Sequence, residues 1–464
     1  MKYFIVTLFV FLTIITNNSP TKNKLKLAKH YKVEQTFSGN TATNNTFHLI
    51  VAKNNETKLF EIIPLTFSNG EINQLVSVIF QDKPEILSYH NNNNVLSLIT
   101  SSKEDKEKVI LIHDLNLESG EITKSKNHNF KDYKSVIQKT NSSLLLYANA
   151  DNFKVVNVTN ANQFNETIVD QNEENKAFLK TLDKEKLDAI NSDEFVANGS
   201  IGSLRAYSNN NLLRITQEDE NENATTVSTI DLSVEGLVSF NTNDFKSDIK
   251  LKKSTSYISD NELIRLNLDK KNGNINIYNL EDDSKKSLDL NKLKPTKKSS
   301  GFEDMETFLK VANKSANAAT ITANKTKTGA LVLRADYVNK ERYYYDNFWF
   351  HHWFHHNQMM LHQQNMQQNV PRFGPSEFLH EEDLYFEKDE QHYFEIVLSE
   401  NRDVLNEEVQ TIYKDYNKKK HLEKLKENKS LDHISATFKE NDLIYLAYNK
   451  KTKEFGVYKK TVLK

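Results

Sequence analysis

Residues 263–278 carry the sequence LIRLNLDKKNGNINIY. Two short segments rich in apolar residues, 263–266 and 275–278, flank a polar turn at Lys271, Asn272 and Gly273. Apolar residues at a period of two, interrupted by a polar turn, are typical of half-buried antiparallel strands. The stretch therefore predicts a β-hairpin.

The same pattern occurs six more times along the chain. The predicted strand pairs are 47–51 with 59–63, 95–99 with 109–112, 144–147 with 153–156, 212–215 with 227–230, 331–335 with 393–397, and 443–446 with 455–458. Their starts lie roughly 50 to 70 residues apart, with one larger gap, and blades of a β-propeller repeat at about 40–50 residues. The chain is therefore expected to be a repeat of hairpins.

These seven pairs, with outer-strand candidates such as residues 75–79, predict an all-β fold. We expect a β-propeller of about seven blades over residues 30–464, since a ring of small sheets leaves only short, protected edges. A β-sandwich or two stacked β domains are the alternatives. Strand starts of the form Asn-x-Leu-Ile-x-Leu resemble the β-propeller superfamily over roughly residues 40–460. No kelch or WD signature recurs, so the resemblance implies no specific family and no catalytic residue.

Three stretches are expected to be helical or irregular additions to loops between strands. They are residues 174–190 and 303–313, where apolar residues recur at roughly helical spacing, and the strongly charged residues 403–428. Additions of this kind are common on loops that connect strands.

The amino terminus resembles a targeting segment. Lys2 precedes an apolar run from Tyr3 to Ile15, and polar residues follow up to Pro20. This order is typical of a secretory signal peptide over residues 1–19; an uncleaved N-terminal anchor is the alternative, although the run is short for a span of about 20 residues. We expect a secreted, periplasmic or extracellular protein with no membrane span after this segment.

Composition excludes several kinds of chemistry. The chain has no cysteine, which rules out disulfides, thiolate metal sites, a cysteine nucleophile and a lipid anchor on cysteine. The net charge is only -2, so no overall field attracts nucleic acid. The sequence contains neither G-x-S-x-G nor a phosphate-binding Gly-rich loop. It therefore predicts no catalytic and no cofactor-binding residue.

One segment is unusual: a histidine- and aromatic-rich insertion at residues 341–391, which holds both tryptophans. If it is helical, its histidines fall four residues apart, a spacing at which two imidazoles can share one divalent ion. The candidate metal ligands are His351, His352, His355, His356 and His362. His380 and His392 are candidates to complete the shell. There is no H-E-x-x-H, so no general-base glutamate stands between paired histidines.

The same insertion is also a candidate interaction surface, because aromatic residues and methionine are enriched at interface cores. The candidate contact residues are Trp349, Phe350, Trp353, Phe354, Met359 and Met360. The partner would be a protein or a glycan, bound at loops or at residues 341–375. Contact with a membrane interface is a further alternative, but the segment lacks the Lys/Arg face of an interfacial helix.

The resulting hypothesis is an exported, non-enzymatic binding or scaffold protein. The alternatives are a polysaccharide-active hydrolase or lyase with its site at the propeller mouth, and a protein that binds a divalent metal through the histidine cluster. A deep pocket with converging carboxylates or histidines would favour an enzyme.

Overall fold

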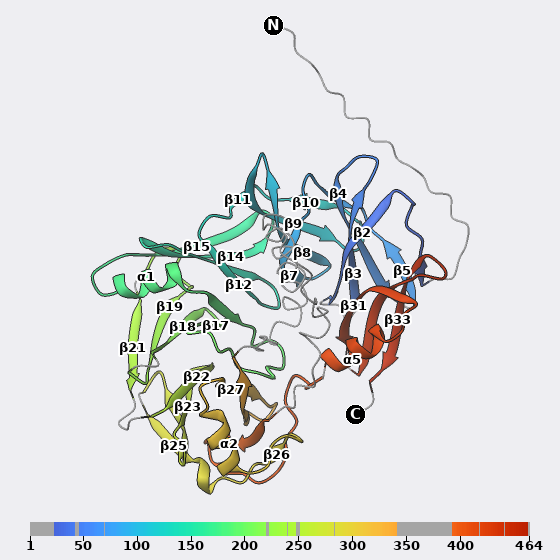
Figure 1. The fold of residues 1–464 in the computed structure, drawn as a ribbon. Helices are drawn as coiled ribbons and strands as arrows, with labels where there is room; N and C mark the ends of the chain where they lie inside the picture. Colours follow the sequence, from blue (N-terminus) through green and yellow to red (C-terminus); the bar gives the residue numbers. More distant parts are fainter. Residues whose placement is uncertain are drawn as a thin grey trace, which may run out of the picture. The chain divides into compact units, whose positions relative to one another are not determined.

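The computed structural model describes residues 23–41, 46–68, 70–219, 222–238, 240–246, 251–282, 284–340, 392–416, 418–439 and 441–462. The chain forms two compact units: unit 1 contains residues 1–79 and 421–464, and unit 2 contains residues 80–420. The described strands form seven separate sheets of four or five strands each (Figure 1).

Unit 1 contains two of these sheets. One has the order β2-β3-β4-β5, with β6 also paired to β4, and the other has the order β1-β33-β32-β31. The strands are β1 (Lys24–Leu25), β2 (Tyr31–Asn40), β3 (Thr46–Asn54), β4 (Phe60–Ser68), β5 (Glu71–Gln74), β6 (Val78–Phe80), β31 (Leu431–Lys439), β32 (Asp442–Asn449) and β33 (Glu454–Thr461). Apolar side chains of β3, β4, β32 and β33 form the core between the two sheets.

The two ends of the described chain meet in one of these sheets. β1 pairs antiparallel with β33, with Lys24 opposite Gly456 and Leu25 opposite Phe455. Leu25 packs against the core of the unit, where Phe455 is buried. A strand from the start of the chain thus completes a sheet built from its last three strands, so that the pairing holds both ends in place.

A buried polar cluster joins the two sheets of unit 1. The Ser38 hydroxyl lies 2.7 Å from Nδ1 of His48 and 2.8 Å from the hydroxyl of Ser435. Ser38 and His48 belong to β2 and β3, whereas Ser435 belongs to β31. His48 is fully buried, and burial lowers its pKa to about 3. The cluster is therefore neutral and contributes hydrogen bonds rather than charge.

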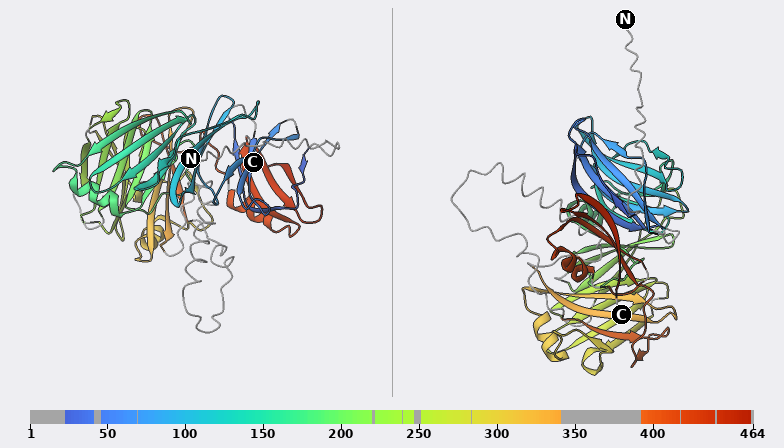
Figure 2. Two further views of the ribbon diagram at one scale, coloured as in Figure 1. Left: turned by 90° about the horizontal axis from the view of Figure 1, so that it is seen from above. Right: turned by 90° about the vertical axis from the view of Figure 1, so that its right-hand side faces the viewer.

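Unit 2 contains five sheets that follow one another in chain order (Figures 1 and 2). Their strands are β7 (Glu85–Asn92), β8 (Val95–Glu104), β9 (Glu107–Asn116), β10 (Ile122–Lys124) and β11 (His128–Asn129); β12 (Tyr133–Gln138), β13 (Ser143–Ala148), β14 (Asn152–Asn160), β15 (Gln163–Asp170) and β20 (Gly236–Leu237); β16 (Leu187–Ile190), β17 (Leu204–Asn209), β18 (Leu212–Asp219), β19 (Ala224–Asp231) and β21 (Asn241–Lys246); β22 (Lys253–Ser259), β23 (Glu262–Leu268), β24 (Gly273–Asn279) and β25 (Lys285–Asp289); and β26 (Lys297–Lys298), β27 (Asn317–Lys325), β28 (Leu331–Asn339), β29 (Phe394–Leu398) and β30 (Val404–Leu405). Consecutive sheets share apolar cores.

The helices are short and lie between strands. They are α1 (Lys176–Lys184), α2 (Met305–Ala312), α5 (Lys418–Lys426) and the 3₁₀ turn η1 (Leu290–Lys292). The first two confirm the helical additions expected at 174–190 and 303–313, although residues 187–190 form β16. In the stretch 403–428 only α5 is helical, because the chain first forms β30 and then an irregular segment up to residue 416. None of the described helices is long and apolar enough to cross a membrane.

All seven predicted hairpins are confirmed as antiparallel pairs: β3 with β4, β8 with β9, β13 with β14, β18 with β19, β23 with β24, β28 with β29, and β32 with β33. The outer strand expected at residues 75–79 is wrong in its bounds, since β5 ends at Gln74 and β6 begins at Val78. The chain is all-β and has the separate small sheets of a β-propeller, as predicted.

The buried histidine predicts an acid sensitivity of unit 1. Because the folded-state pKa of His48 lies below its unfolded value, stability is complete above about pH 6.5 and falls as the pH drops toward the folded pKa of about 3. At pH 4 the loss from this group is on the order of 3 kcal/mol. We expect His48→Gln to flatten the fall in unfolding free energy between pH 6.5 and 4, measured by urea unfolding. The control His30→Gln should keep the wild-type slope; an equal slope in all three proteins would contradict the assignment.

Candidate functional site

A pocket of about 330 Å³ opens in unit 2, where four consecutive sheets come together. It is lined by residues 137–139, 191–194, 207–210, 257–260 and 323–325, with Val196, Arg214, Ile412 and Tyr413. The first four of these sheet-derived groups stand at or just after the carboxyl ends of β12, β16, β17 and β22, and the fifth ends β27. Each of the four sheets thus contributes the carboxyl end of a strand at one of its edges, β12, β16, β22 or β27, and β17 lies next to β16.

Tight turns bring polar groups to this end. Asn210 and Asp260, the residues that follow β17 and β22, have φ values of 50° and 51°. Asn and Asp tolerate this left-handed conformation better than other non-glycine residues. These turns direct backbone carbonyls and side-chain oxygens toward neighbouring sheets. The Arg214 guanidinium donates to the carbonyl of Asp260 at 2.7 Å and to Oδ1 of Asn261 at 2.8 Å.

The charged groups at the pocket have protein partners. Lys139 donates from Nζ to the carbonyl of Asn210 at 2.7 Å. Asp260 forms an ion pair with Lys325 and accepts a hydrogen bond from Nδ2 of Asn209 at 3.1 Å. Asp193 accepts from the Thr140 hydroxyl at 3.2 Å. Burial lowers the pKa of Lys139, and Asp193 opposes that shift. These contacts connect one sheet to the next, so the charged groups stabilise the fold.

Aromatic side chains form the rest of the wall. The rings of Tyr207 and Tyr257 meet edge to face, with centroids 5.4 Å apart. Burial raises the pKa of Tyr207 to about 12 and also raises that of Tyr257. Both phenols are therefore neutral at any physiological pH. Amide and hydroxyl side chains, including Gln138, Asn191 and Ser259, complete the lining.

One wall is an irregular segment, residues 411–416, that we call the strap. Ile412 and Tyr413 are 44% and 42% exposed, which places two large apolar side chains at the rim. The strap is attached to the end of β27, where Thr411 bridges to Thr326 and the amide of Ile412 donates to the carbonyl of Lys325 at 2.8 Å.

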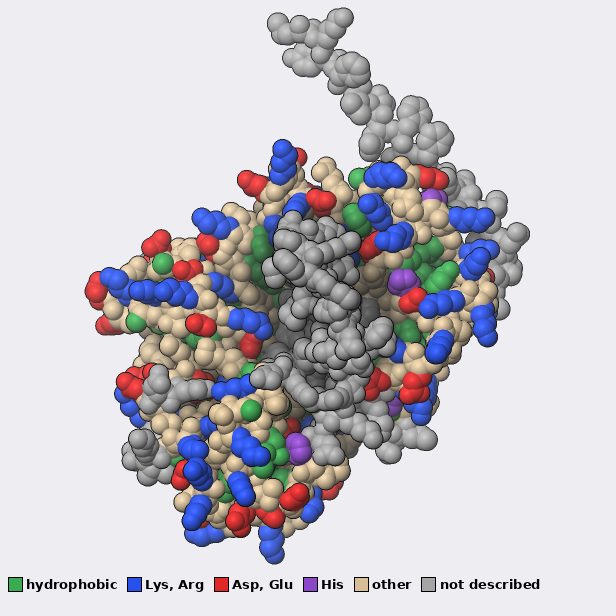
Figure 3. Space-filling model, viewed as in Figure 1, with side chains coloured by type: hydrophobic (Ala, Val, Ile, Leu, Met, Phe, Trp, Pro, Cys, Tyr) green, Lys and Arg blue, Asp and Glu red, His purple; other side chains and the backbone are tan. Residues whose placement is uncertain are grey.

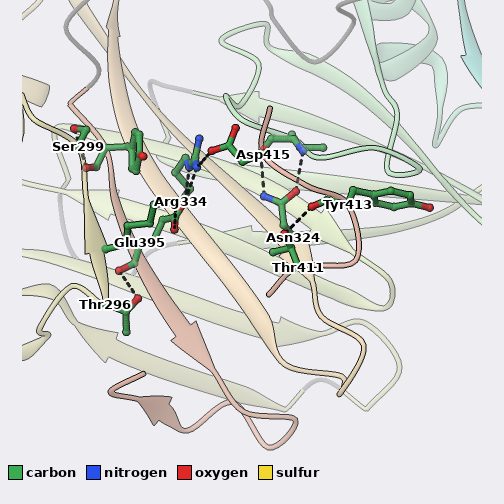
Figure 4. Close-up of polar contacts among 11 residues, drawn as sticks. Thr296, Ser299, Asn324, Arg334, Glu395, Thr411, Tyr413 and Asp415 are labelled. Carbon is green, nitrogen blue, oxygen red and sulfur yellow. Dashed lines mark hydrogen bonds and ion pairs between the residues drawn. The ribbon is translucent and has the colours of Figure 1, made fainter. Parts of the chain in front are cut away.

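Arg334 on β28 anchors the other end of the strap. Its Nε and Nη2 donate to Oε1 of Glu395 at 2.7 and 2.5 Å, and Nη2 also donates to Oδ2 of Asp415 at 2.6 Å (Figure 4). The Arg334 side chain is 2% exposed. Burial lowers its pKa, but the charges of Asp415 and Glu395 outweigh burial and raise it. Arg334 thus remains charged and holds the strap through Asp415.

Arg334 also contacts the opposite wall of the pocket. Its guanidinium lies 4.0 Å from the ring centroid of Tyr393 and 4.9 Å from that of Phe195. Phe195 lies within the wall formed by residues 191–196, which Asn324 fixes through hydrogen bonds of 2.8 and 3.0 Å with the amide and carbonyl of Val196 (Figure 4). Two separate walls of the pocket therefore depend on β27 and β28.

Of the residues predicted from the sequence to bind a metal or a partner, the structure describes only His392. His351, His352, His355, His356, His362 and the contact residues Trp349, Phe350, Trp353, Phe354, Met359 and Met360 lie outside the described residues, as do residues 1–19. Their roles stay predictions. His392, proposed to complete a metal shell, is described: its Nδ1 lies 3.0 Å from the carbonyl of Gly301, and its ring stacks on Tyr337. Among the described residues, no three His, Asp or Glu side chains form a group that could hold a metal.

The pocket residues were not predicted. They come from the strap and from six strands or the residues just after them, namely β12, β16, β17, β18, β22 and β27, and no pair of sequence neighbours shows that they meet. The one available signal is the pair Ile412 and Tyr413, two large apolar residues within the strongly charged stretch 403–428. Exposed at the end of a charged segment, such residues indicate contact with a ligand or with another part of the fold.

No protein-family model and no curated protein matches the chain. Solved structures resemble it weakly. The β-propeller domain of the trilobed protease from Pyrococcus furiosus matches with a TM-score of 0.33 and 7% identity over 93% of this chain and 97% of that one. The WD40 domain of SCAP from fission yeast gives 0.29 and 6% over 68% and 86%. The GH43_1 enzyme from Xanthomonas citri in complex with xylose gives 0.23 and 10% over 58% and 90%. Similarities this low carry no functional argument.

The buried Arg334 should contribute more to the stability of unit 2 than the more exposed Lys297, the other cation near Glu395. In Arg334→Met the Glu395 carboxylate, 7% exposed, stays buried without its main cation, and we expect the unfolding free energy of unit 2 to fall by about 3–5 kcal/mol. The matched control is Lys297→Met, which removes a half-exposed cation 3.9 Å from the same carboxylate and should cost less than about 1 kcal/mol. Urea unfolding measures both; equal losses would contradict the role given to Arg334.

The strap can be tested without a ligand. Asp415→Asn removes the charge that Arg334 holds, so we expect faster amide hydrogen exchange in residues 411–416 and unchanged exchange in β27 and β28. Unaltered exchange in the strap would show that the bridge to Thr326 alone keeps it in place.

Proposed function

We propose that this chain is an exported, non-enzymatic binding protein whose pocket in unit 2 holds an uncharged, polyhydroxylated ligand such as a sugar unit of a glycan. The volume of about 330 Å³ lies at the lower end of the range of about 300–1,000 Å³ typical of ligand sites. Export is supported by the sequence of residues 2–20 alone.

The proposal rests on the observation that the cations of the pocket, and Asp260, already have partners within the protein. Lys139, Lys325, Arg214 and Asp260 line the pocket, yet each is engaged by the protein. A charged ligand would have to break these contacts, whereas the amides and hydroxyls of the lining both donate and accept hydrogen bonds. Such groups complement the hydroxyls of a neutral sugar.

The rim supplies the apolar part of recognition. Tyr413 exposes its ring beside the pocket, and a tyrosine ring offers a rigid apolar face with a polar tip. The C–H face of a sugar ring can pack on that surface while its hydroxyls reach the amides. We therefore assign Tyr413 the role of stacking platform.

A hydrolase is the second candidate, favoured by one observation: Asp193, Glu194 and Asp260 all line the same pocket. Hydrolysis of a glycosidic bond needs one carboxylic acid and one carboxylate at the bond. Asp260 is already paired with Lys325, which favours binding. Release of reducing sugar by the wild type, lost in Asp193→Asn, would favour the enzyme instead.

Tyr413 provides the test of the binding function. On an array of neutral mono- and oligosaccharides, we expect the wild type to retain at least one sugar, and Tyr413→Ala to weaken that binding by about fivefold, because a stacked ring contributes about 1 kcal/mol. Tyr413→Phe keeps the ring and should bind nearly as well.

The matched control is Val234→Ala, which trims another exposed apolar side chain, 48% exposed and absent from the pocket lining. Its affinity, measured by titration calorimetry with the same sugar, should equal that of the wild type. Unchanged affinity in Tyr413→Ala, or no sugar bound by the wild type, would reject the proposal.

A further inference from the structure

The two units carry opposite charge. Unit 1 contains 18 lysines, no arginine and ten acidic residues, whereas unit 2 contains 43 basic and 53 acidic residues. The net charge of -2 therefore conceals a basic unit and an acidic one. A charge asymmetry of this kind points to a local anionic partner that the total charge does not reveal.

Five exposed lysines of unit 1 gather along one side of a single sheet. They are Lys24, Lys26, Lys451, Lys453 and Lys460, which we call the basic edge. β1 is the edge strand of this sheet and carries Lys24, with Lys26 directly after it; Lys460 lies on the adjacent β33, and Lys451 and Lys453 lie in the turn before β33. Figure 3 shows Lys and Arg side chains on this side of the molecule, as on the rest of the visible face.

These five lysines are not used by the fold. Neighbouring lysines do form ion pairs, for example Lys450 with Asp432 at 3.2 Å and Lys459 with Asp442 at 2.8 Å. Among the described parts of the chain, no ion pair within 4.0 Å is recorded for any member of the basic edge. Five ammonium groups along one edge that repel one another indicate a role outside the fold.

Protection of the edge strand explains only part of this pattern. Lysine on an edge strand prevents pairing with another chain, and this accounts for Lys24 and Lys26. It also accounts for Lys460, which lies on β33 beyond the two residues that β1 covers. It does not account for Lys451 and Lys453, which lie in the turn before β33. These two lysines point to a ligand.

We propose that the basic edge binds an acidic polysaccharide, that is, a sugar polymer with carboxylate or sulfate groups. Such a polymer offers regularly spaced single charges, which match the compact, strongly hydrated ammonium of lysine. The site is separate from the pocket and does not depend on the sugar proposed there.

Two other anionic partners fit less well. Stable binding to a membrane surface usually combines cations with apolar side chains that enter the lipid, but the apolar residues next to these lysines, Leu25 and Leu27, pack against the core of the unit. Lysine can contact the phosphates of nucleic acid, but base recognition and binding of single strands rely on arginine or on aromatic rings free to stack. Unit 1 has no arginine, and the nearby Tyr445 and Tyr458 stack on each other with centroids 5.1 Å apart.

The experiment uses the full chain with heparin and polygalacturonate as probes. We expect both polymers to bind with an affinity that falls as salt rises, because binding releases counterions. The double variant Lys451→Glu, Lys460→Glu should bind about tenfold or more weakly, with a shallower salt dependence. The control Lys270→Glu, Lys271→Glu makes the same change of charge in a β-hairpin turn of unit 2, where both lysines are exposed, and should bind as the wild type does.

The outcomes separate this site from the pocket and from other partners. Equal binding by the two double variants, or no binding of either polymer at low salt, overturns the proposal. Binding to phosphatidylglycerol vesicles or duplex DNA in place of the polysaccharides overturns the assigned partner. Tyr413→Ala should leave heparin binding unchanged, so the failure of one site does not decide the other.

Discussion

The constraint on which unit 2 depends is that a sheet in this chain is apolar on both faces. In β13, Leu144 and Leu146 enter the core shared with the following sheet, whereas Leu145 and Tyr147 enter the core shared with the preceding one. Alternate residues of a strand point to opposite faces, so no sheet of this kind is stable alone. The pocket forms where the carboxyl ends of the edge strands β12, β16, β22 and β27 and of β17 meet.

The same constraint explains what could be predicted from the sequence. Six of the seven hairpins are local, so a period-two pattern and a polar turn were sufficient to predict them. For β28 and β29, which are separated by the insertion, only the apolar pattern of the two strands was available. The pocket is non-local: Arg334 meets Glu395 and Asp415 across 61 and 81 positions. The predicted pairing of residues 331–335 with 393–397 brings Arg334 close to Glu395, but nothing in the sequence near either residue indicates Asp415. The predicted bounds of the outer strand at residues 75–79 were wrong for a related reason. An outer strand pairs on one side only, so a single neighbour fixes where it begins and ends.

Buried polar groups mark the places where apolar packing does not specify the contact. In unit 1 the cluster of Ser38, His48 and Ser435 joins two sheets through neutral hydrogen bonds. In unit 2 Arg334 uses full charges, and the strap it holds is exposed at Tyr413. Removing one partner of a buried charged group costs about 3–5 kcal/mol, because it leaves an uncompensated buried charge. A charged anchor therefore holds an irregular segment that buries too little apolar surface to hold itself.

The two units also differ in how their charged side chains are engaged. In unit 2 the cations beside the pocket are engaged with carbonyls and carboxylates, which leaves short-range hydrogen bonding and stacking as the means of recognition. In unit 1 the lysines of the basic edge form no ion pair with the described residues, so the recognition that we propose there would act through the electrostatic field. A field of this kind is screened by salt within about 10 Å, whereas hydrogen bonds inside a pocket are not. One chain thus presents two surfaces that differ in the physical force on which they depend.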